Sequence, residues 1–209
     1  VSDRDEQNRE TIFDRLPKNL PRLITVGRLD LDSEGLLLMT NDGDLARHLE
    51  LPSTGWSRKY RVRAQGQIDK SELASLANGV TIEGICYGQV VAKLDRQMTS
   101  NAWLTIAIRE GKNREIRRIM DHLGHKISRL IRVSYGPFQL GNLKDGDIEA
   151  IKARVLADQL GISDSAADTS DKSTLYINKP AHNPAGKRGR NANHSRKSSR
   201  NHFNKTGRG

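Results

Sequence analysis

The chain has one cysteine, few aromatic residues and no long apolar run, and each shortage narrows the class of protein. Because Cys86 is alone, an intramolecular disulfide is excluded, and its side chain is expected to be a small buried apolar group. No stretch approaches the roughly 20 apolar residues that a membrane-spanning helix needs, and the first residues are polar where a secretion signal is apolar. We therefore expect a cytoplasmic protein with no membrane partner.

The basic residues are unevenly distributed along the chain. Between Lys172 and Gly209 there are ten Lys and Arg and no Asp or Glu, so the formal charge of +10 belongs to this segment. Its Asn, Gly and Ser residues bury too little apolar surface to offset the entropy of ordering. We predict that residues 161–209 form a disordered basic tail that follows RNA or DNA phosphates, with a passive solubilising tail as the alternative.

The first 160 residues alternate short strands with a few helices, which indicates an α+β fold. A brief apolar run predicts a strand at residues 24–26, a Leu-rich run that ends at a turn predicts one at 35–40, and alternating polar and apolar residues predict one at 58–63. Further strands are expected at residues 88–94, 102–108 and 127–133. Helical spacing of apolar residues and capping signals predict helices at residues 44–49, 69–77, 113–123 and 147–160.

Two segments carry the residues of an active site. Residues 26–38 read Val-Gly-Arg-Leu-Asp-Leu-Asp-Ser-Glu-Gly-Leu-Leu-Leu, which places Asp30 between an arginine and an apolar run. Residues 109–118 read Arg-Glu-Gly-Lys-Asn-Arg-Glu-Ile-Arg-Arg and supply cations. A carboxylate in a partly apolar cleft tends to take up a proton, and a nearby guanidinium opposes this. The second segment is therefore suited to keep Asp30 ionised.

With these two motifs the chain resembles the rRNA pseudouridine synthases, the ribosomal small- and large-subunit uridine-to-pseudouridine synthases, and above all their large-subunit branch. The resemblance runs from about Glu10 to Leu160 and includes residues 11–17 and 132–137. It implies a mixed, mostly antiparallel sheet flanked by helices, with a central RNA-binding cleft. It also implies a monomer that isomerises one uridine of ribosomal RNA without a cofactor or a metal.

The resemblance gives roles to four residues. Asp30 matches the family's nucleophile, which attacks either the ribose C1′ or the uracil C6. Tyr60 matches the tyrosine whose ring lies against the target base, a contact worth ~1–3 kcal/mol, with a half-buried strand tyrosine as the alternative. Arg117 matches the arginine that pairs with the nucleophile. Arg28 matches the basic residue that helps to displace the uridine, with a surface ion pair as the alternative.

Further cations near Arg117 are expected to contact RNA phosphates at the rim of the cleft. Singly they are weak signals, because exposed charges usually only solvate a surface, but their grouping favours RNA binding. They are Lys112, Arg114, Arg118, Arg129 and Arg132.

Two segments partly resemble metal sites but lack necessary ligands. Asp30–Gly35 imitates the first half of a calcium loop, but the twelfth position is Asn41, where a bidentate Glu is needed. His122 and His125 lie near the expected end of a helix without a cysteine or a third ligand at a suitable spacing. The sequence therefore predicts no metal.

Two other functions remain as alternatives. A non-catalytic RNA-binding or ribosome-assembly protein would use the same arginines and tail but would not need Asp30. A metal-dependent nuclease needs clustered carboxylates, and residues 30–34 supply three, but the neighbouring arginine opposes metal binding.

The chain departs from the family's pattern at its front. Members usually carry a small basic RNA-binding domain and a strand with Lys-Pro-Xaa-Gly before the position where this sequence starts. We therefore expect residues 1–160 to be an N-terminally truncated catalytic domain, from a fragment or a mis-started gene. The basic tail is expected to restore part of the lost RNA affinity.

Overall fold

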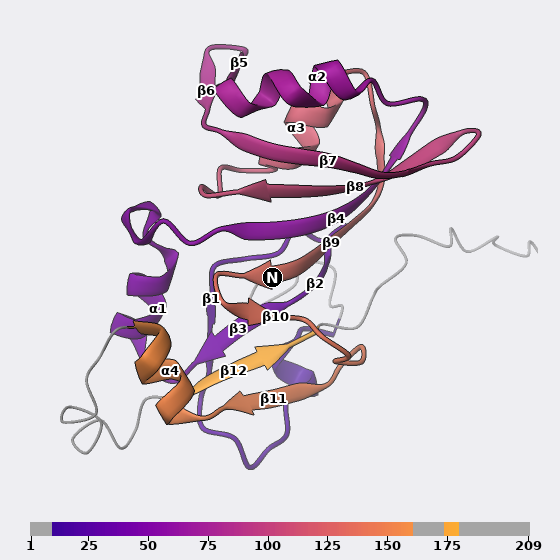
Figure 1. The fold of residues 1–209 in the computed structure, drawn as a ribbon. Coiled ribbons are helices and arrows are strands. Elements are labelled where there is room, and N and C mark those ends of the chain that lie inside the picture. The colour runs from indigo at the N-terminus through magenta and orange to yellow at the C-terminus, as the bar shows by residue number, and fades with distance from the viewer. Residues whose placement is uncertain (1–9, 161–173, 180–209) are drawn as a thin grey trace, which may run out of the picture.

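The computed structural model describes residues 10–160 and 174–179, whose strands form two larger sheets and a hairpin (Figure 1). The first sheet has the order β10-β9-β4-β8-β7, and β2 pairs with β9 in parallel while the other neighbours are antiparallel. Its strands are β2 (Glu34–Gly35), β4 (Arg58–Gln65), β7 (Val90–Gln97), β8 (Asn101–Ile108), β9 (Ile127–Tyr135) and β10 (Phe138–Gln139).

The second sheet has four antiparallel strands in the order β1-β3-β12-β11. They are β1 (Ile24–Val26), β3 (Leu37–Thr40), β11 (Ile148–Ile151) and β12 (Leu175–Asn178). The hairpin pairs β5 (Val80–Ile82) with β6 (Ile85–Tyr87). Because β1 and β3 belong to this sheet and β2 to the other, residues 27–36 cross from one sheet to the other and return.

The helices begin where the sequence provides caps. The Asp42 carboxylate accepts hydrogen bonds from two backbone N–H groups at the start of α1, and the Asp69 carboxylate accepts one at the start of α2. The helices are α1 (Gly43–Glu50), α2 (Lys70–Ser75), α3 (Glu115–His122) and α4 (Ala153–Leu160). Single 3-10 turns lie at Phe13–Arg15, Pro52–Thr54 and Leu76–Asn78.

One face of the first sheet is buried and the other is open. Residues of β8 alternate between half-buried and buried, and the buried ones share a core with α2 and α3. A second core lies between α1, α4 and the four-stranded sheet. Helices α2 and α3 therefore cover one face of the first sheet.

Gly35 is required where the two sheets meet. Its φ is +103°, and a Cβ there would lie 2.2 Å from the carbonyl oxygen of Arg132. Only glycine lets β2 approach β9 this closely. The approach fixes the end of the segment that carries Asp30.

The α+β class and the mostly antiparallel sheet are confirmed. The strand predicted at residues 24–26 has the predicted ends, the one at 35–40 is divided between β2 and β3, and the other four are present with shifted ends. The helix predicted at residues 147–160 is wrong in its first half, where β11 replaces it. Ile148 and Ile151 are three residues apart, which imitates a helical stripe. Cys86 is exposed rather than buried.

The prediction of a disordered stretch over residues 161–209 is wrong at β12, and its other residues lie outside the described ranges apart from 174 and 179. β12 pairs with β3 on one side and β11 on the other, and Leu175 is fully buried. Thr174 N–H donates to Asn41 Oδ1 at 2.8 Å, and Asn178 Nδ2 donates to the carbonyl of Asp147 at 2.9 Å. A segment beyond residue 171 therefore belongs to the folded domain.

Candidate active site

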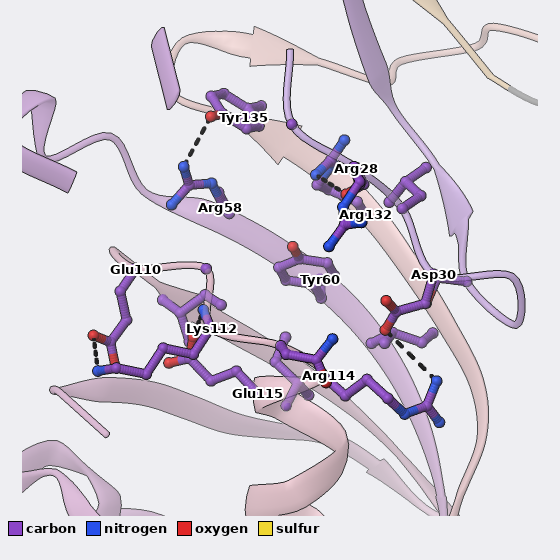
Figure 2. Close-up of a pocket in the computed structure, with 18 of the residues that line it drawn as sticks. Arg28, Asp30, Arg58, Tyr60, Glu110, Lys112, Arg114, Glu115, Arg132 and Tyr135 are labelled. Atoms are coloured by element: carbon purple, nitrogen blue, oxygen red, sulfur yellow. Dashed lines mark hydrogen bonds and ion pairs between the residues drawn. The ribbon is translucent and has the colours of Figure 1, made fainter. Parts of the chain in front are cut away.

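A cavity of about 620 Å³ lies where the two segments singled out in the sequence come together (Figure 2). This volume is typical of a small-molecule or nucleotide site. Its walls come from the loop between β1 and β2, from β4, from the loop between β8 and α3, from the start of α3 and from β9. The structure thus unites residues about eighty positions apart.

The loop of residues 27–33 holds Asp30 at the cavity wall. Leu29 is buried, which anchors the residue before Asp30, and Ser33 N–H donates to the Asp30 carbonyl at 2.9 Å. At the start of the loop, Gly27 N–H donates to the Glu50 carboxylate at 2.6 Å. The Asp30 side chain keeps 33% of its surface exposed, so its carboxylate is held but accessible.

Two arginines of the second segment hold this loop. Arg114 donates from Nη1 and Nη2 to the two oxygens of Asp32, at 3.0 and 3.1 Å, and its Nη1 lies 3.8 Å from Asp30 Oδ2. Arg117 Nη2 donates to the carbonyl of Asp32 at 2.7 Å, and its Nε lies 3.3 Å from Asp32 Oδ2. Arg117 thus forms its ion pair with Asp32 rather than with Asp30, whose charge nevertheless acts on it, while Arg114 pairs with both carboxylates.

The arginines decide the ionisation of this end of the cavity. Partial burial raises the pKa of Asp32, but the hydrogen bonds from Arg114 and the charges of Arg117 and Arg114 outweigh it, so its pKa lies below the ordinary value. Burial lowers the pKa of the Arg117 guanidinium, which the charge of Asp32 opposes. Asp32 is therefore ionised at neutral pH.

Arg114 reaches both carboxylates from a strained backbone. Its φ is +50°, in the left-handed region that a non-glycine residue rarely adopts. It directly precedes α3, and no side chain caps the helix there. Such strain costs of order 1–3 kcal/mol and persists only where surrounding contacts hold it.

Tyr60 and Arg28 both line the cavity. Tyr60 is half-buried on β4 and presents its ring to the cavity, and Arg28 is exposed above it (Figure 2). Arg132 lines the same wall and is only 2% exposed, so its predicted place at the rim is wrong. Its Nε donates to the Leu36 carbonyl at 2.7 Å, while Nη2 is buried without a partner among the described residues.

The other cations predicted at the rim do not form one cluster. Lys112 lines the cavity, and its Nζ donates to the Cys86 carbonyl at 2.8 Å and pairs with Glu110. Arg129 does not line it and instead donates to both oxygens of the buried Glu34, at 2.7 and 2.9 Å. Arg118 is exposed on α3, also outside the cavity lining.

A second pair of carboxylates lines the cavity and was not predicted. Glu115 is 3% exposed and accepts a hydrogen bond from Lys112 N–H at 3.0 Å, and Glu110 accepts one from Gly88 N–H at 2.8 Å. Burial raises the pKa of Glu115 to about 7. Burial also raises the pKa of Glu110, but hydrogen bonds from Lys112 and Gly88 outweigh it and leave this pKa below its ordinary value. Glu115 therefore holds the proton of the pair.

Arg58 and Tyr135 were also missed. Arg58 Nη2 donates to the Tyr135 hydroxyl at 2.8 Å, and that hydroxyl donates to the Leu49 carbonyl at 2.9 Å. Both residues line the cavity, and Arg58 is 9% exposed. The alternation of β4 was a usable signal, because a residue two positions before Tyr60 faces the same side.

No metal centre emerges from residues 10–160 and 174–179, where no three His, Cys, Asp or Glu side chains are grouped to hold an ion. The first-segment carboxylates instead diverge, since Asp30 and Asp32 meet Arg114 while Glu34 meets Arg129. None of the described helices is long and apolar enough to cross a membrane.

Comparison with known proteins adds independent findings. A family model described as RNA pseudouridylate synthase matches residues 2–122, which contain both segments. An uncharacterized RNA pseudouridine synthase of Rickettsia conorii is 48% identical over 153 residues, 73% of this chain and 66% of that protein. Ribosomal large subunit pseudouridine synthase B of Salmonella typhi is 44% identical over 137 residues, 65% of this chain and 47% of that protein.

A solved structure agrees with the fold. A crystal structure titled as that of a pseudouridylate synthase matches with a TM-score of 0.63 at 25% identity, over 71% of this chain and 65% of that one. The chain spans about two thirds or less of the length of the curated relatives named above.

Proposed function

The chain belongs to the RNA pseudouridylate synthase family, and on that premise we propose that it isomerises a uridine of ribosomal RNA to pseudouridine with Asp30 as the nucleophile. The observation that carries the proposal is the position of Asp30. Its carboxylate is one-third exposed at the wall of a nucleotide-sized cavity, 3.8 Å from the guanidinium of Arg114, and Tyr60 lines the same cavity.

The target base has to leave its RNA stack before it can reach Asp30. Enzymes that act on a base pay a few kcal/mol to unstack it and recover this through contacts in the pocket. The ring of Tyr60 supplies a surface for the base, and the exposed Arg28 is placed to contact the backbone beside it.

The chemistry needs one nucleophile and conserves all atoms. Asp30 adds either to the ribose C1′, which displaces uracil at N1, or to C6 of the uracil, after which the bond between N1 and C1′ breaks with its electron pair leaving on N1. The base then turns, a bond forms between C1′ and C5, the proton on C5 is lost and N1 gains a proton. Asp30 leaves as a carboxylate, so no oxidant or reductant is consumed.

The arginines prepare Asp30 without reacting. Arg114 and Arg117 fix Asp32 and the loop, so the Asp30 carboxylate is positioned before the substrate binds.

Large-subunit RNA is the target that relatives favour. Proteins named ribosomal large subunit pseudouridine synthase B, from Salmonella typhi and Haemophilus influenzae, are 44% and 40% identical to this chain over their matched segments. Unmodified large- and small-subunit rRNA transcripts, treated in parallel and mapped for pseudouridine, test this target. We expect a modified uridine only in the large-subunit transcript, and modification of the small-subunit transcript alone would contradict it.

Release of tritium from RNA carrying 5-tritiated uridine tests the reaction, because bond formation at C5 expels that hydrogen and mere binding does not. We expect release by the parent chain and none by Asp30→Asn, which keeps the shape of the side chain but removes its charge. Asp158→Asn is the matched control, because Asp158 is exposed on α4 and does not line the cavity.

The outcomes separate the enzyme from the alternative. Equal release by the parent and Asp30→Asn removes Asp30 from the chemistry. RNA binding without release by any variant would favour a non-catalytic RNA-binding or ribosome-assembly protein.

The basic tail is proposed to add affinity for RNA phosphates. Residues 180–209 contain eight Lys and Arg and no Asp or Glu. A deletion that starts at residue 172 would also remove β12, so the test deletes residues 180–209 only. We expect the deletion to weaken RNA binding and flatten its salt dependence, and unchanged binding would refute the role.

A further inference from the structure

The face of the first sheet that looks away from α2 and α3 carries a group of cations. Strand register places Lys93 of β7 and Arg61 of β4 on either side of Thr105, and Arg96 and Arg63 on either side of Trp103. Lys59 follows the same alternation on β4. We call this set the outer sheet face: Lys59, Arg61, Arg63, Lys93, Arg96, Trp103 and Thr105.

The opposite side of β4 lines the cavity. Arg58 and Tyr60 point into the cavity, so Lys59 and Arg61, which alternate with them, point away from it. The core residues of β8 lie on the cavity side, between the sheet and the helices. The outer sheet face is therefore a separate surface that shares a strand with the candidate active site.

Its charge is largely uncompensated. Within the described ranges, no ion pair is recorded for any of the five cations. The neighbouring carboxylate of Asp95 accepts a hydrogen bond from Thr105 Oγ1 at 2.8 Å. Lys59, Arg61, Lys93 and Arg96 are exposed, so this surface attracts an anionic partner.

The arginines on this face are oriented for phosphate groups. The Arg61 guanidinium lies over the Trp103 ring, 4.7 Å from its centre, which holds the fork flat and occupies the ring face that a base would need. Arg63 donates to Asn101 Oδ1 at 3.2 Å through its Nε, so its two terminal NH₂ groups are available to a phosphate. Flat guanidinium forks bind phosphate oxygens in pairs.

We propose that the outer sheet face binds the phosphate backbone of a second segment of the substrate RNA, on the side of the sheet opposite the cavity. The inference rests on the proposed function only for its choice of RNA over another polyanion. Such contacts position an RNA without reading its sequence. The enzyme should therefore favour a long folded RNA over a short oligonucleotide that fills only the cavity.

The test is the salt dependence of binding to a folded rRNA fragment. The variant Lys59→Gln/Lys93→Gln/Arg96→Gln removes three cations that make no described hydrogen bond, ion pair or ring contact. The affinity of the parent falls as salt rises, and each lost phosphate contact makes the slope of log K against log salt shallower by roughly 0.7–0.9. We therefore expect the three-cation variant to have a slope shallower than that of the parent by about 2. The control Lys18→Gln/Lys70→Gln/Lys144→Gln removes the same charge from exposed positions off this face.

Two further measurements make the test decisive. Arg61→Lys/Arg63→Lys keeps the charge but removes the flat forks, so it should keep the slope while weakening RNA binding at every salt concentration. On a short oligonucleotide that carries the target uridine, the three-cation variant should release tritium as fast as the parent. On the folded fragment its kcat/KM should fall.

The proposal would be overturned if the slope of the three-cation variant equalled that of the control variant, whether both matched the parent or both became shallower by the same amount. Absence of tritium release by the parent would overturn the proposed function, while the slope would still decide whether this face binds RNA.

Discussion

Asp30 faces the cavity from one side and Glu110 and Glu115 face it from the other, and the carboxylates at these two ends have different electrostatic surroundings (Figure 2). Asp30 and Asp32 lie beside the guanidinium groups of Arg114 and Arg117. Glu110 and Glu115 lie beside the ammonium group of Lys112 and deeper in the protein. The pKa of Asp32 is lowered, whereas that of Glu115 is raised to about 7.

The difference follows from the kind of cation and the degree of burial. The Arg114 fork donates to both oxygens of the Asp32 carboxylate and Arg117 forms an ion pair with it, and the charge of neither arginine depends on pH. Around Glu115 burial dominates, and the nearby charge of Glu110 raises its pKa further. The arginine end therefore holds an ionised Asp32 beside Asp30, the proposed nucleophile, while Glu110 and Glu115 accept hydrogen bonds from the backbone of Gly88 and Lys112.

The largest expected effect comes from Arg117→Met, which removes the fork that holds Asp32 while keeping an apolar stem. Loss of the bond to the Asp32 carbonyl lets the loop move, and such misplacement costs roughly 100-fold in kcat. Single-turnover tritium release measures it. Arg118→Met is the control, because Arg118 is exposed on the same helix, and equal losses in both variants would contradict the account.

Arg114→Gly is expected to cost less activity, roughly tenfold, because Arg117 still holds the loop. Glycine also tolerates φ of +50°, so this variant should unfold at a higher temperature than Arg114→Gln, which loses the fork and keeps the strain. Thermal unfolding of both variants checks this. Equal melting temperatures would show that the backbone at Arg114 stores no strain.

Arg114→Gln should also alter stability in acid. The lowered pKa of Asp32 gives the folded state stability that is present above pH about 3.8 and lost as pH falls through the folded pKa. Without Arg114 this pKa rises, so the variant should lose stability at a higher pH than the parent. Acid unfolding followed by circular dichroism measures the midpoints, and identical midpoints would contradict the role of Arg114.

Glu115→Gln is the corresponding test at the glutamate end of the cavity. Burial raises the pKa of Glu115 from 4.5 to about 7, so the folded state binds the extra proton and the free energy of unfolding falls as pH rises between these values. Glutamine imitates the protonated acid, so the variant should lose this fall, which is on the order of 1–3 kcal/mol. Urea unfolding at pH 4.5 and pH 8 measures it, with Glu149→Gln, an exposed carboxylate, as control. If the free energy of unfolding changed with pH in the same way for the parent and the variant, the raised pKa of Glu115 would be refuted.

Lys112→Gln should have the smallest effect on the fold. It removes the ion pair with Glu110, and because the Lys112 side chain is 42% exposed, we expect less than about 1 kcal/mol of lost stability. If Lys112 also contacts RNA, as predicted, KM rises a few-fold while kcat is unchanged. Steady-state kinetics separate the two, and a large fall in kcat would place Lys112 with the arginine end.

The sequence predicted which segments meet, but not which atoms. Asp30, Tyr60 and Arg117 line one cavity, as the motifs indicated. The partner of Arg117 was assigned by resemblance, and Asp32, only two residues from Asp30, takes it instead. Which of two neighbouring carboxylates meets a helix depends on the turn between them, and that turn is closed by a backbone bond that the sequence does not announce.

The sequence did not predict strand β12, because its partner strands are far from it along the chain. β12 is four residues long within a polar, basic segment, and its partners β3 and β11 lie far from it in sequence. The local composition around β12 is polar and basic, and it gives no sign of the two strands that bury Leu175. Glu115 was missed for a similar reason, since its burial comes from packing and not from the basic motif around it.

The most direct test of the account compares Asp30→Asn and Glu115→Gln in the same tritium-release assay at pH 8. The account predicts no release by Asp30→Asn and release within about threefold of the parent by Glu115→Gln, since only the first variant removes the reacting carboxylate. Release by Asp30→Asn, or loss of release by a folded Glu115→Gln, would contradict it.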